Sequence, residues 1–412
     1  MAVETLSFGC RLNTVEAEVM RAHAAPAAGD RDLVLVNTCA VTTEAGRQAR
    51  KAIRRLARER PGAEIVVTGC GAEIETAAYA GMPEVARLVG NGAKLRSGTW
   101  AAVPADAAAP GAIMAERAAE PTRIAAMAGH TRAFVPVQNG CDHRCTFCVI
   151  PFGRGNSRSV PAADVVAQVR RIVDHGGREA VLTGVDLTAY GRDLDPGLSL
   201  GRLAQRILRE VPDLARLRLS SIDSIEADEA LLDAFATEPR LMPHVHLSLQ
   251  AGDDLILKRM KRRHARADAI GFCERLRSLR PGTVFGADLI AGFPTETEAQ
   301  FARSVDLVAE CGLTHLHVFP YSARPGTPAA RMPQLPGEIV RERAARLRAA
   351  GAAALRRHLD GEVGGYRTVL TERGGIGRTE AFTPVRLSGD VEPGVLLDVI
   401  IAGHDGRTLL AA

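Results

Sequence analysis

Short apolar runs alternate with helical stretches along most of this 412-residue chain, and that alternation restricts the possible folds more than any other feature. Near the amino terminus, apolar or β-branched runs typical of strands lie at residues 3–8, 33–37 and 65–68. Two helical stretches, at residues 15–24 and 44–59, separate them. Strands that alternate with helices form parallel sheets covered by helices. We therefore predict an α/β domain with a doubly wound parallel sheet over residues 1–98.

The same alternation resumes at residue 133 and continues for six units. The predicted strands of this region lie at residues 133–137, 180–183, 217–220, 244–248, 284–290 and 316–319. Six consecutive strand–helix units predict a partial (β/α)6 barrel over residues 130–357, because parallel strands of this kind curve around a common core.

Two segments depart from this pattern. Residues 99–129 are rich in Ala, Pro and Gly and only weakly periodic, so we predict a linker there. Beyond residue 358, strand candidates at residues 366–372, 382–387, 396–402 and 408–410 are separated by glycine-containing turns. Residues 358–412 are therefore predicted to form a small all-β barrel.

Composition narrows the functional classes only slightly. The net charge of +4 says little about partners, and the 46% hydrophobic content is ample for folded cores. The first residues lack the pattern of a signal peptide, and no run of about 18 apolar residues suggests a membrane span. We expect a cytoplasmic protein, in which eight cysteines favour metal ligation or catalysis over disulfides.

Cys141, Cys145 and Cys148 place three thiols in one loop directly after a predicted strand. Soft thiolates select zinc or an iron–sulfur cluster, and a structural zinc site needs four closed ligands. A cluster of four irons also has four corners, and no fourth cysteine lies nearby. Three ligands would leave one iron open to a bound molecule. The alternative is a zinc loop in which His143 or a distant group is the fourth ligand.

Cys10, Cys39 and Cys70 each lie just beyond the end of a predicted strand. The carboxyl ends of parallel strands share one edge of a sheet, where open α/β folds bind ligands. Gly9 and Gly69 would let the backbone turn sharply beside a bound group. The three thiols are predicted to converge on a second metal centre, the alternative being that they are buried free cysteines. Cys273 and Cys311 lie within predicted helices and are expected to be structural.

These motifs resemble the radical S-adenosylmethionine (SAM) superfamily and, within it, the methylthiotransferases. The resemblance rests on Phe-Gly-Cys-Arg-Leu-Asn (8–13), Asn-Thr-Cys-Ala-Val-Thr (37–42), Thr-Gly-Cys-Gly-Ala (68–72), Gln-Asn-Gly-Cys-Asp-His-Arg-Cys-Thr-Phe-Cys-Val-Ile-Pro (138–151) and Leu-Ser-Leu-Gln-Ala-Gly (247–252). The stretches 9–16, 258–263 and 317–329 are most similar to the branch that acts on threonylcarbamoyladenosine. The β unit stands where that family has its RNA-binding TRAM domain.

The resemblance implies two [4Fe–4S] clusters, one on each set of three cysteines, with SAM as radical source and methyl donor. It places SAM contacts at strand ends and the adjoining loop, at Phe147, Gly184, Asp186, Ser248, Gln250, Ile290 and Gly292. Candidates for tRNA contact are Arg154, Arg158, Lys261, Arg262 and Arg263. The basic run 258–263 would suit phosphates, and is equally typical of a solvated helix face.

The activity implied is addition of a methylthio group to C2 of N6-threonylcarbamoyladenosine next to the tRNA anticodon (position 37). An electron donor such as flavodoxin or ferredoxin is expected, together with a sulfur donor whose nature the sequence leaves open. Two other hypotheses remain. The substrate would be isopentenyl-adenosine or a ribosomal protein, or the chain would be a non-catalytic iron–sulfur protein that binds RNA.

Overall fold

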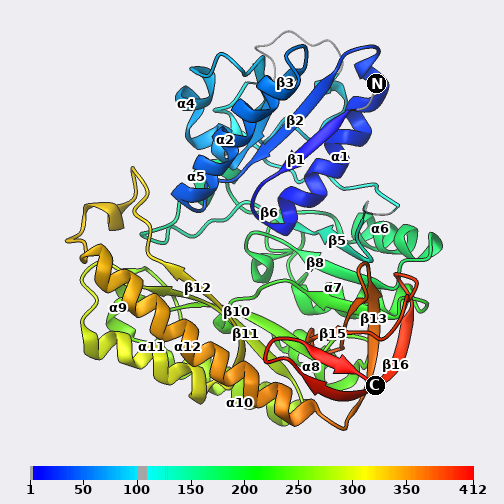
Figure 1. Cartoon of the computed structure of the whole chain (residues 1–412), viewed down its shortest axis with the longest axis vertical. Coiled ribbons are helices and arrows are strands. Elements are labelled where there is room, and N and C mark those ends of the chain that lie inside the picture. Colours follow the sequence, from blue (N-terminus) through cyan, green and yellow to red (C-terminus); the bar gives the residue numbers. More distant parts are fainter. Residues whose placement is uncertain (1–2, 101–108, 126, 128) are drawn as a thin grey trace.

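The computed structural model describes residues 3–100, 109–125, 127 and 129–412, which form three units (Figure 1). The first unit has a four-stranded parallel sheet in the order β1 (Glu4–Ser7), β2 (Leu33–Thr38), β3 (Glu64–Gly69) and β4 (Arg87–Leu88). Its helices are α1 (Arg11–Ala28), α2 (Thr43–Glu59), α3 (Cys70–Ile74) and α4 (Thr76–Ala80).

The central strand β2 explains why this sheet is covered on both faces. All six of its residues are buried. Leu33 and Leu35 pack with α1, whereas Val34 and Val36 pack with α2, because successive side chains of a strand point to opposite faces. The side chain of Thr42 accepts a hydrogen bond from the backbone of Ala45 and begins α2. The predicted doubly wound sheet is confirmed.

The second unit contains six parallel strands in chain order. They are β5 (Arg132–Pro136), β8 (Glu179–Thr183), β9 (Arg216–Leu219), β10 (His244–Gln250), β11 (Val284–Ala291) and β12 (Leu313–Pro320). Two three-stranded sheets are joined between β9 and β10 by parallel bridges, Leu217 to Leu241 and Ile222 to Leu247. The predicted partial barrel is therefore confirmed.

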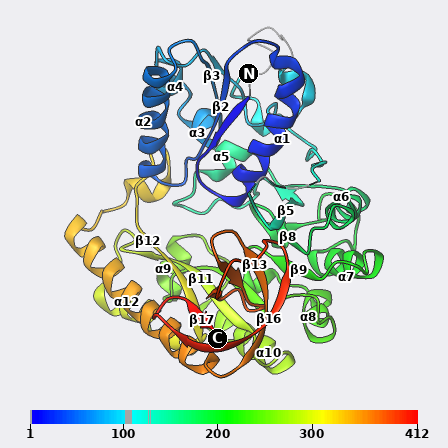
Figure 2. The same cartoon turned by 45° about the vertical axis from the view of Figure 1, so that its right-hand side comes forward.

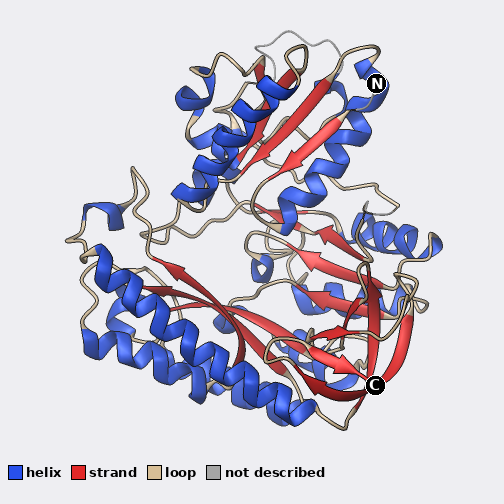
Figure 3. Cartoon of the chain, in the orientation of Figure 1, coloured by secondary structure: helices blue, strands red, loops and turns tan. Residues whose placement is uncertain are grey.

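Helices surround these strands on the outside (Figure 3). The long helices are α6 (Ala162–Asp174), α7 (Leu200–Glu210), α8 (Glu229–Thr237), α10 (Arg266–Leu279), α11 (Glu298–Glu310) and α12 (Gly337–Glu362). Shorter elements are β6 (Gln138–Asn139), α5 (Ile150–Arg154), β7 (Arg158–Ser159) and α9 (Asp254–Arg259). Cys273 and Cys311 are buried in the apolar core between helices and strands, in keeping with a structural role.

The third unit is a closed barrel of β13 (Tyr366–Glu372), β14 (Ile376–Arg378), β15 (Pro384–Arg386), β17 (Leu409–Ala411) and β16 (Leu396–His404). The all-β prediction is confirmed, but β14 falls partly within a segment that we expected to be a turn. Gly374 and Gly375, both with positive φ, make that turn alone, and Ile376 already pairs with Glu372.

The segment predicted as a linker is packed where the structure describes it; residues 101–108, 126 and 128 lie outside the described residues. Trp100 is buried and donates its indole N–H to the carbonyl of Lys94 at 3.0 Å. Ile113 and Met127 are also buried. Among the described helices, none is long and apolar enough to cross a membrane.

The first unit lies against both edges of the central strands (Figures 1 and 2). On one side, Val15 and Val19 of α1 pack on Phe134 and Val181 of β5 and β8. On the other, Arg324, in the loop after β12, donates a hydrogen bond to Glu75 at 2.8 Å.

The C-terminal barrel lies at the opposite end of the central strands. It contacts the first residues of β5, β9 and β10, which are Arg132, Arg216 and His244. The cysteine loop and the C-terminal barrel are thus separated by the length of the strands.

Candidate active site

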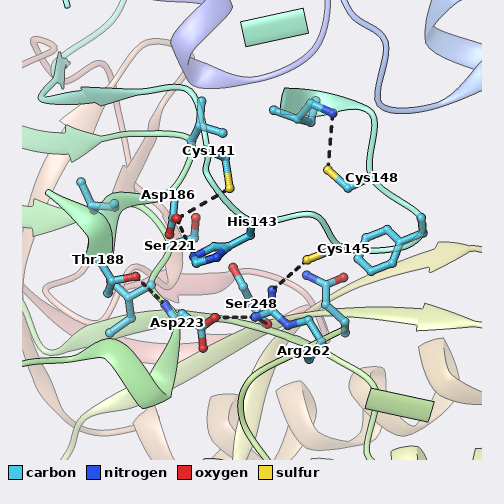
Figure 4. Close-up of a pocket in the computed structure, with 16 residues that line it drawn as sticks. Cys141, His143, Cys145, Cys148, Asp186, Thr188, Ser221, Asp223, Ser248 and Arg262 are labelled. Atoms are coloured by element: carbon cyan, nitrogen blue, oxygen red, sulfur yellow. Dashed lines mark hydrogen bonds and ion pairs between the residues drawn. The ribbon is translucent and has the colours of Figure 1, made fainter. Parts of the chain in front are cut away.

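The loop between β6 and α5 brings Cys141, Cys145 and Cys148 together, and their sulfur atoms face one common space (Figure 4). Burial, followed by the charge of Asp186, raises the pKa of the Cys141 thiol well above its usual range. Burial raises the pKa of Cys148 to about 11, with a further contribution from Cys145. A bound cation would favour the thiolates of Cys141 and Cys148, so this donor set fits a metal centre.

A cavity adjoins the three thiols at the carboxyl ends of β5, β8, β9 and β10. Of the residues expected to contact SAM, four line it: Phe147, Asp186, Ser248 and Gln250. The structure also adds Thr188 and Ser221 to this lining, which sequence reasoning missed because each is an ordinary residue in a loop.

The other three residues expected at SAM do not line the cavity. Gly184 lies just before the lining residue Val185, and a Cβ there would be 2.9 Å from the Gln138 side-chain oxygen. Ile290 is buried in an apolar cluster against which Phe147 packs. Gly292 has a φ of +77° and donates its N–H to Glu296 at 3.0 Å. Within the apolar cluster of Ile290, the ring of Phe147 packs edge-on against Phe293, with ring centroids 6.5 Å apart.

His143 and Asp186 form an ion pair beside Cys141. The ring nitrogen Nε2 of His143 is 2.9 Å from Asp186, and the thiol of Cys141 is 3.6 Å from the same carboxylate. Hydrogen bonds to Asp186 and Glu226 raise the pKa of His143 to about 9. These three side chains are close enough to share one ion, which is the geometric basis of the zinc alternative.

The basic run after α9 is used largely within the protein. Arg262 donates to Asp223 at 2.8 Å and to the Ser248 carbonyl at 2.7 Å, and it lies 3.9 Å from the Cys145 sulfur. Arg263 also pairs with Asp223, at 3.0 Å. Lys261 is exposed and has a φ of +58°. Asp223 was missed as a site residue, because nothing in its local sequence signals two arginine partners.

The second set of thiols meets at the carboxyl edge of the first sheet, as the strand-end pattern predicts. Cys10 precedes α1, Cys39 follows β2 and Cys70 begins α3. Burial, together with the nearby thiols of Cys70 and Cys10, raises the pKa of Cys39 to about 11. Gly9 has a φ of +102°, and a Cβ there would be 2.7 Å from the Cys39 sulfur. Glycine is therefore required for this close approach.

A buried charge network lies directly behind Cys70. Arg154 donates from Nε to the Cys70 sulfur at 3.1 Å and pairs with Glu16 at 2.8 Å. Lys94 pairs with the same carboxylate at 2.6 Å. Although burial acts to raise the pKa of Glu16, Arg154 and Lys94 hold it at about 2.

Arg154 and Arg158, the two arginines after the cysteine loop, are buried, whereas we expected them to face a bound tRNA. Arg154 is 2% exposed and Arg158 is 5% exposed. Arg158 donates to the backbone carbonyls of Asn156 and Arg154. A bound RNA would not reach either guanidinium in this arrangement, because protein groups surround both.

The two sets of cysteines face each other across the contact between α3 and α5. Cys70, Ala40 and Val149 share one apolar cluster. A Cβ on Gly153 would be 3.2 Å from the Cys70 Cβ. Cys70 of the N-terminal set is therefore packed close to Val149, the residue that follows Cys148 of the central set.

Two family models match the chain. The model described as "Radical SAM superfamily" matches residues 135–308, and "Uncharacterized protein family UPF0004" matches residues 2–90. The radical S-adenosylmethionine methyltransferase TsrM from Kitasatospora setae superposes with a TM-score of 0.54 at 16% identity, over 78% of this chain and 80% of that one. This likeness shows a shared fold. The central unit is thus that of a radical SAM enzyme, a class that binds a [4Fe–4S] cluster and SAM.

Similar sequences extend the match to the whole chain. A threonylcarbamoyladenosine tRNA methylthiotransferase MtaB from Rickettsia prowazekii is 45% identical over 97% of this chain and 94% of the relative. A protein of the same name from Bacillus subtilis is 32% identical over 83% and 78%. A tRNA-2-methylthio-N(6)-dimethylallyladenosine synthase from Novosphingobium aromaticivorans is 34% identical over 96% and 94%. This chain belongs to the radical SAM methylthiotransferase family.

Proposed function

We propose that the protein adds a methylthio group to C2 of N6-threonylcarbamoyladenosine next to the anticodon of tRNA. The main support is the 45% identity, over 97% of the chain, to a relative named for that nucleoside. Two sets of three thiols in adjoining parts of the molecule, with Cys70 packed beside Val149, support the same chemistry, because the reaction needs both a radical source and a sulfur source.

In this proposal Cys141, Cys145 and Cys148 hold the cluster that binds SAM. Together, cluster and SAM supply a radical able to remove hydrogen from an unactivated carbon. Asp186 accepts a hydrogen bond from the SAM amino group, and Ser248 and Gln250 hydrogen-bond the ribose. Phe147 contacts the adenine. All four residues line the cavity.

Arg262 keeps this cavity in shape. Its guanidinium ties Asp223 to the Ser248 carbonyl on the wall beside the thiols. Arg262 and Arg263 are both engaged by carboxylates, so the exposed Lys261 remains the candidate of this run for tRNA contact.

Cys10, Cys39 and Cys70 hold a second [4Fe–4S] cluster, which supplies the sulfur. Arg154 donates a hydrogen bond to the Cys70 sulfur and so fixes the position of one proposed cluster ligand. A flavodoxin or ferredoxin is the proposed electron donor. The C-terminal barrel is proposed to contact the tRNA.

A second candidate substrate is isopentenyl-adenosine, because a relative named for the dimethylallyl nucleoside is 34% identical over 96% of the chain. Mass spectrometry of tRNA nucleosides from a deletion strain separates the two. Loss of the methylthio form of threonylcarbamoyladenosine, restored by the intact gene, supports the proposal. Loss of the methylthio isopentenyl form instead would overturn it. If both nucleosides are unchanged, a protein substrate takes their place.

A further inference from the structure

The inner face of the central barrel is polar. Along β10, β11 and β12, every second residue points away from the helices. In this way His246, Asp288 and His317 meet inside, with ring nitrogens 2.9 and 3.1 Å from one carboxylate oxygen. The side chain of His317 is 60% exposed, so solvent reaches this face.

Arginines surround the far end of the same face. Phe382 of the C-terminal barrel is packed against His244, with ring centroids 5.0 Å apart. Four guanidinium groups lie within 5.7 Å of the Phe382 ring centroid, those of Arg11, Arg132, Arg218 and Arg378.

Two carboxylates pair with three of these four arginines. Glu179 binds Arg218 at 3.0 Å. Glu372 binds Arg132 at 2.9 Å and lies 3.7 Å from Arg378. The cluster therefore carries an excess of positive charge.

Arg11 is the remaining cation. Within the part of the chain that the structure describes, its guanidinium has no carboxylate or carbonyl partner and lies 5.7 Å from the ring centroids of both Phe134 and Phe382. The excess of positive charge around Phe382, together with this unpaired guanidinium, suits the site to an anionic ligand.

The position of Arg11 relates that missing anion to the reaction. Arg11 directly follows Cys10, and its side chain extends from that thiol toward Phe134 in the middle of β5. A base held between the two cysteine sets would direct its N6 substituent along this face. A threonylcarbamoyl group ends in a carboxylate and a hydroxyl, whereas a dimethylallyl group is wholly apolar.

We propose that Arg11 binds the carboxylate of the N6 substituent and so selects an anionic, polar N6 group over an isoprenoid one. This inference rests on the proposed function and goes beyond it by assigning substrate selection to one residue. Arg11 is a binding residue and takes no part in the transfer itself. The histidines along β10 and β12 suit the polar remainder of the substituent, because neutral imidazoles donate and accept hydrogen bonds.

The test uses the anaerobically reconstituted enzyme with anticodon stem-loop RNAs. The target base is threonylcarbamoyladenosine, its methyl ester, isopentenyl-adenosine or adenosine. For the wild type, kcat/KM with the acid should exceed that with the ester by about 10- to 100-fold, as expected for a charge-assisted hydrogen bond. In Arg11→Gln that ratio should fall close to one, and Arg11→Lys should retain part of it. Arg21→Gln, on an exposed turn of the same helix, is the matched control.

Three results would overturn the inference. In the first, the wild type has the same kcat/KM for the acid and the ester. In the second, Arg11→Gln keeps the wild-type ratio of acid to ester. In the third, Arg11→Gln lowers kcat/KM for all four RNAs equally, as the loss of a phosphate contact would. The ester comparison needs no variant, so it decides even if Arg11→Gln binds less iron. Failure of the proposed function looks different, since the wild type would then leave the acid RNA unmodified.

Discussion

The two sets of three cysteines are brought together by different parts of the backbone, one by a single loop and the other by three separate strand ends. The central thiols lie within residues 141–148 of one loop, beside a cavity and close to the ion pair of His143 and Asp186. The N-terminal thiols come from three separate strand ends, and a buried network of Arg154, Glu16 and Lys94 lies behind them. A loop can keep its ligands together by itself, whereas the second set depends on the packing of the whole domain. The first set should therefore tolerate damage elsewhere, and the second should not.

The largest expected effect separates the two sets by their products. Cys145→Ala should abolish formation of 5′-deoxyadenosine from SAM, because the SAM-binding cluster loses one of three ligands. Cys39→Ala should retain 5′-deoxyadenosine formation but yield no methylthio-nucleoside. Product chromatography and iron content per chain measure both. Cys273→Ala, in the apolar core, is the control and should keep both products. Equal loss of 5′-deoxyadenosine in the Cys39 and Cys145 variants would contradict the division of labour.

Removing the buried arginine should come next in size. Arg154→Gln leaves Glu16 with Lys94 as its only ion-pair partner among the described residues and removes the hydrogen bond to Cys70. Breaking a buried pair of this kind costs about 3–5 kcal/mol of unfolding free energy. Denaturant unfolding of the iron-free protein measures it, and Arg47→Gln, on the exposed face of α2, should change little. If the variant is as stable as the wild type, the network does not support the second set.

A smaller effect is expected at the backbone turn before Cys70. Gly69 has a φ of +95°, and a Cβ there would be 2.4 Å from the Thr38 carbonyl oxygen. Gly69→Ala should therefore cost about 1–3 kcal/mol and lower the iron content of the second site before that of the first. Gly62→Ala, where a Cβ would meet open space, is the control. Equal iron loss at both sites, resolved by electron paramagnetic resonance, would argue against it.

The smallest effect concerns the central loop. Asp186→Asn should lower the pKa of His143 from about 9 toward its ordinary value, because the hydrogen bond to Asp186 is the main cause of the rise. The folded pKa is raised, so the stabilisation is complete below about pH 6.5 and is lost as pH rises through about 9. A nuclear magnetic resonance titration of His143 in iron-free protein measures this. Asp142→Asn, whose carboxylate accepts from the Ser157 backbone, should leave it unchanged.

The sequence predicts those parts of the molecule that depend on local periodicity. Strand ends follow from short apolar runs, so the convergence of Cys10, Cys39 and Cys70 could be inferred before any coordinates. Glycine-containing turns predicted the strand boundaries less well, because the turn at Gly374 and Gly375 is followed directly by β14, which the sequence did not indicate. Thr188 and Ser221 also line the cavity, but neither belongs to a sequence motif that could have identified it.

Long-range charge pairing could not be predicted. Glu16 and Arg154 are 138 positions apart, and only folding makes them partners. An arginine beside a cluster loop looks like an RNA contact in sequence, and its burial reverses that interpretation. Asp223 binds Arg262 across a shorter separation of 39 positions. Pairs of this kind depend on tertiary packing, which single-sequence patterns do not encode.

Phe382 has a consequence for how the C-terminal barrel is used. It adopts a φ of +71° and inserts its ring among arginines of three different units of the chain. The C-terminal barrel is therefore joined to both other units through this one ring. Replacing the barrel with that of a relative would also change the surroundings of Arg11, so such chimeras should change which nucleoside is accepted if Arg11 selects the substrate as proposed.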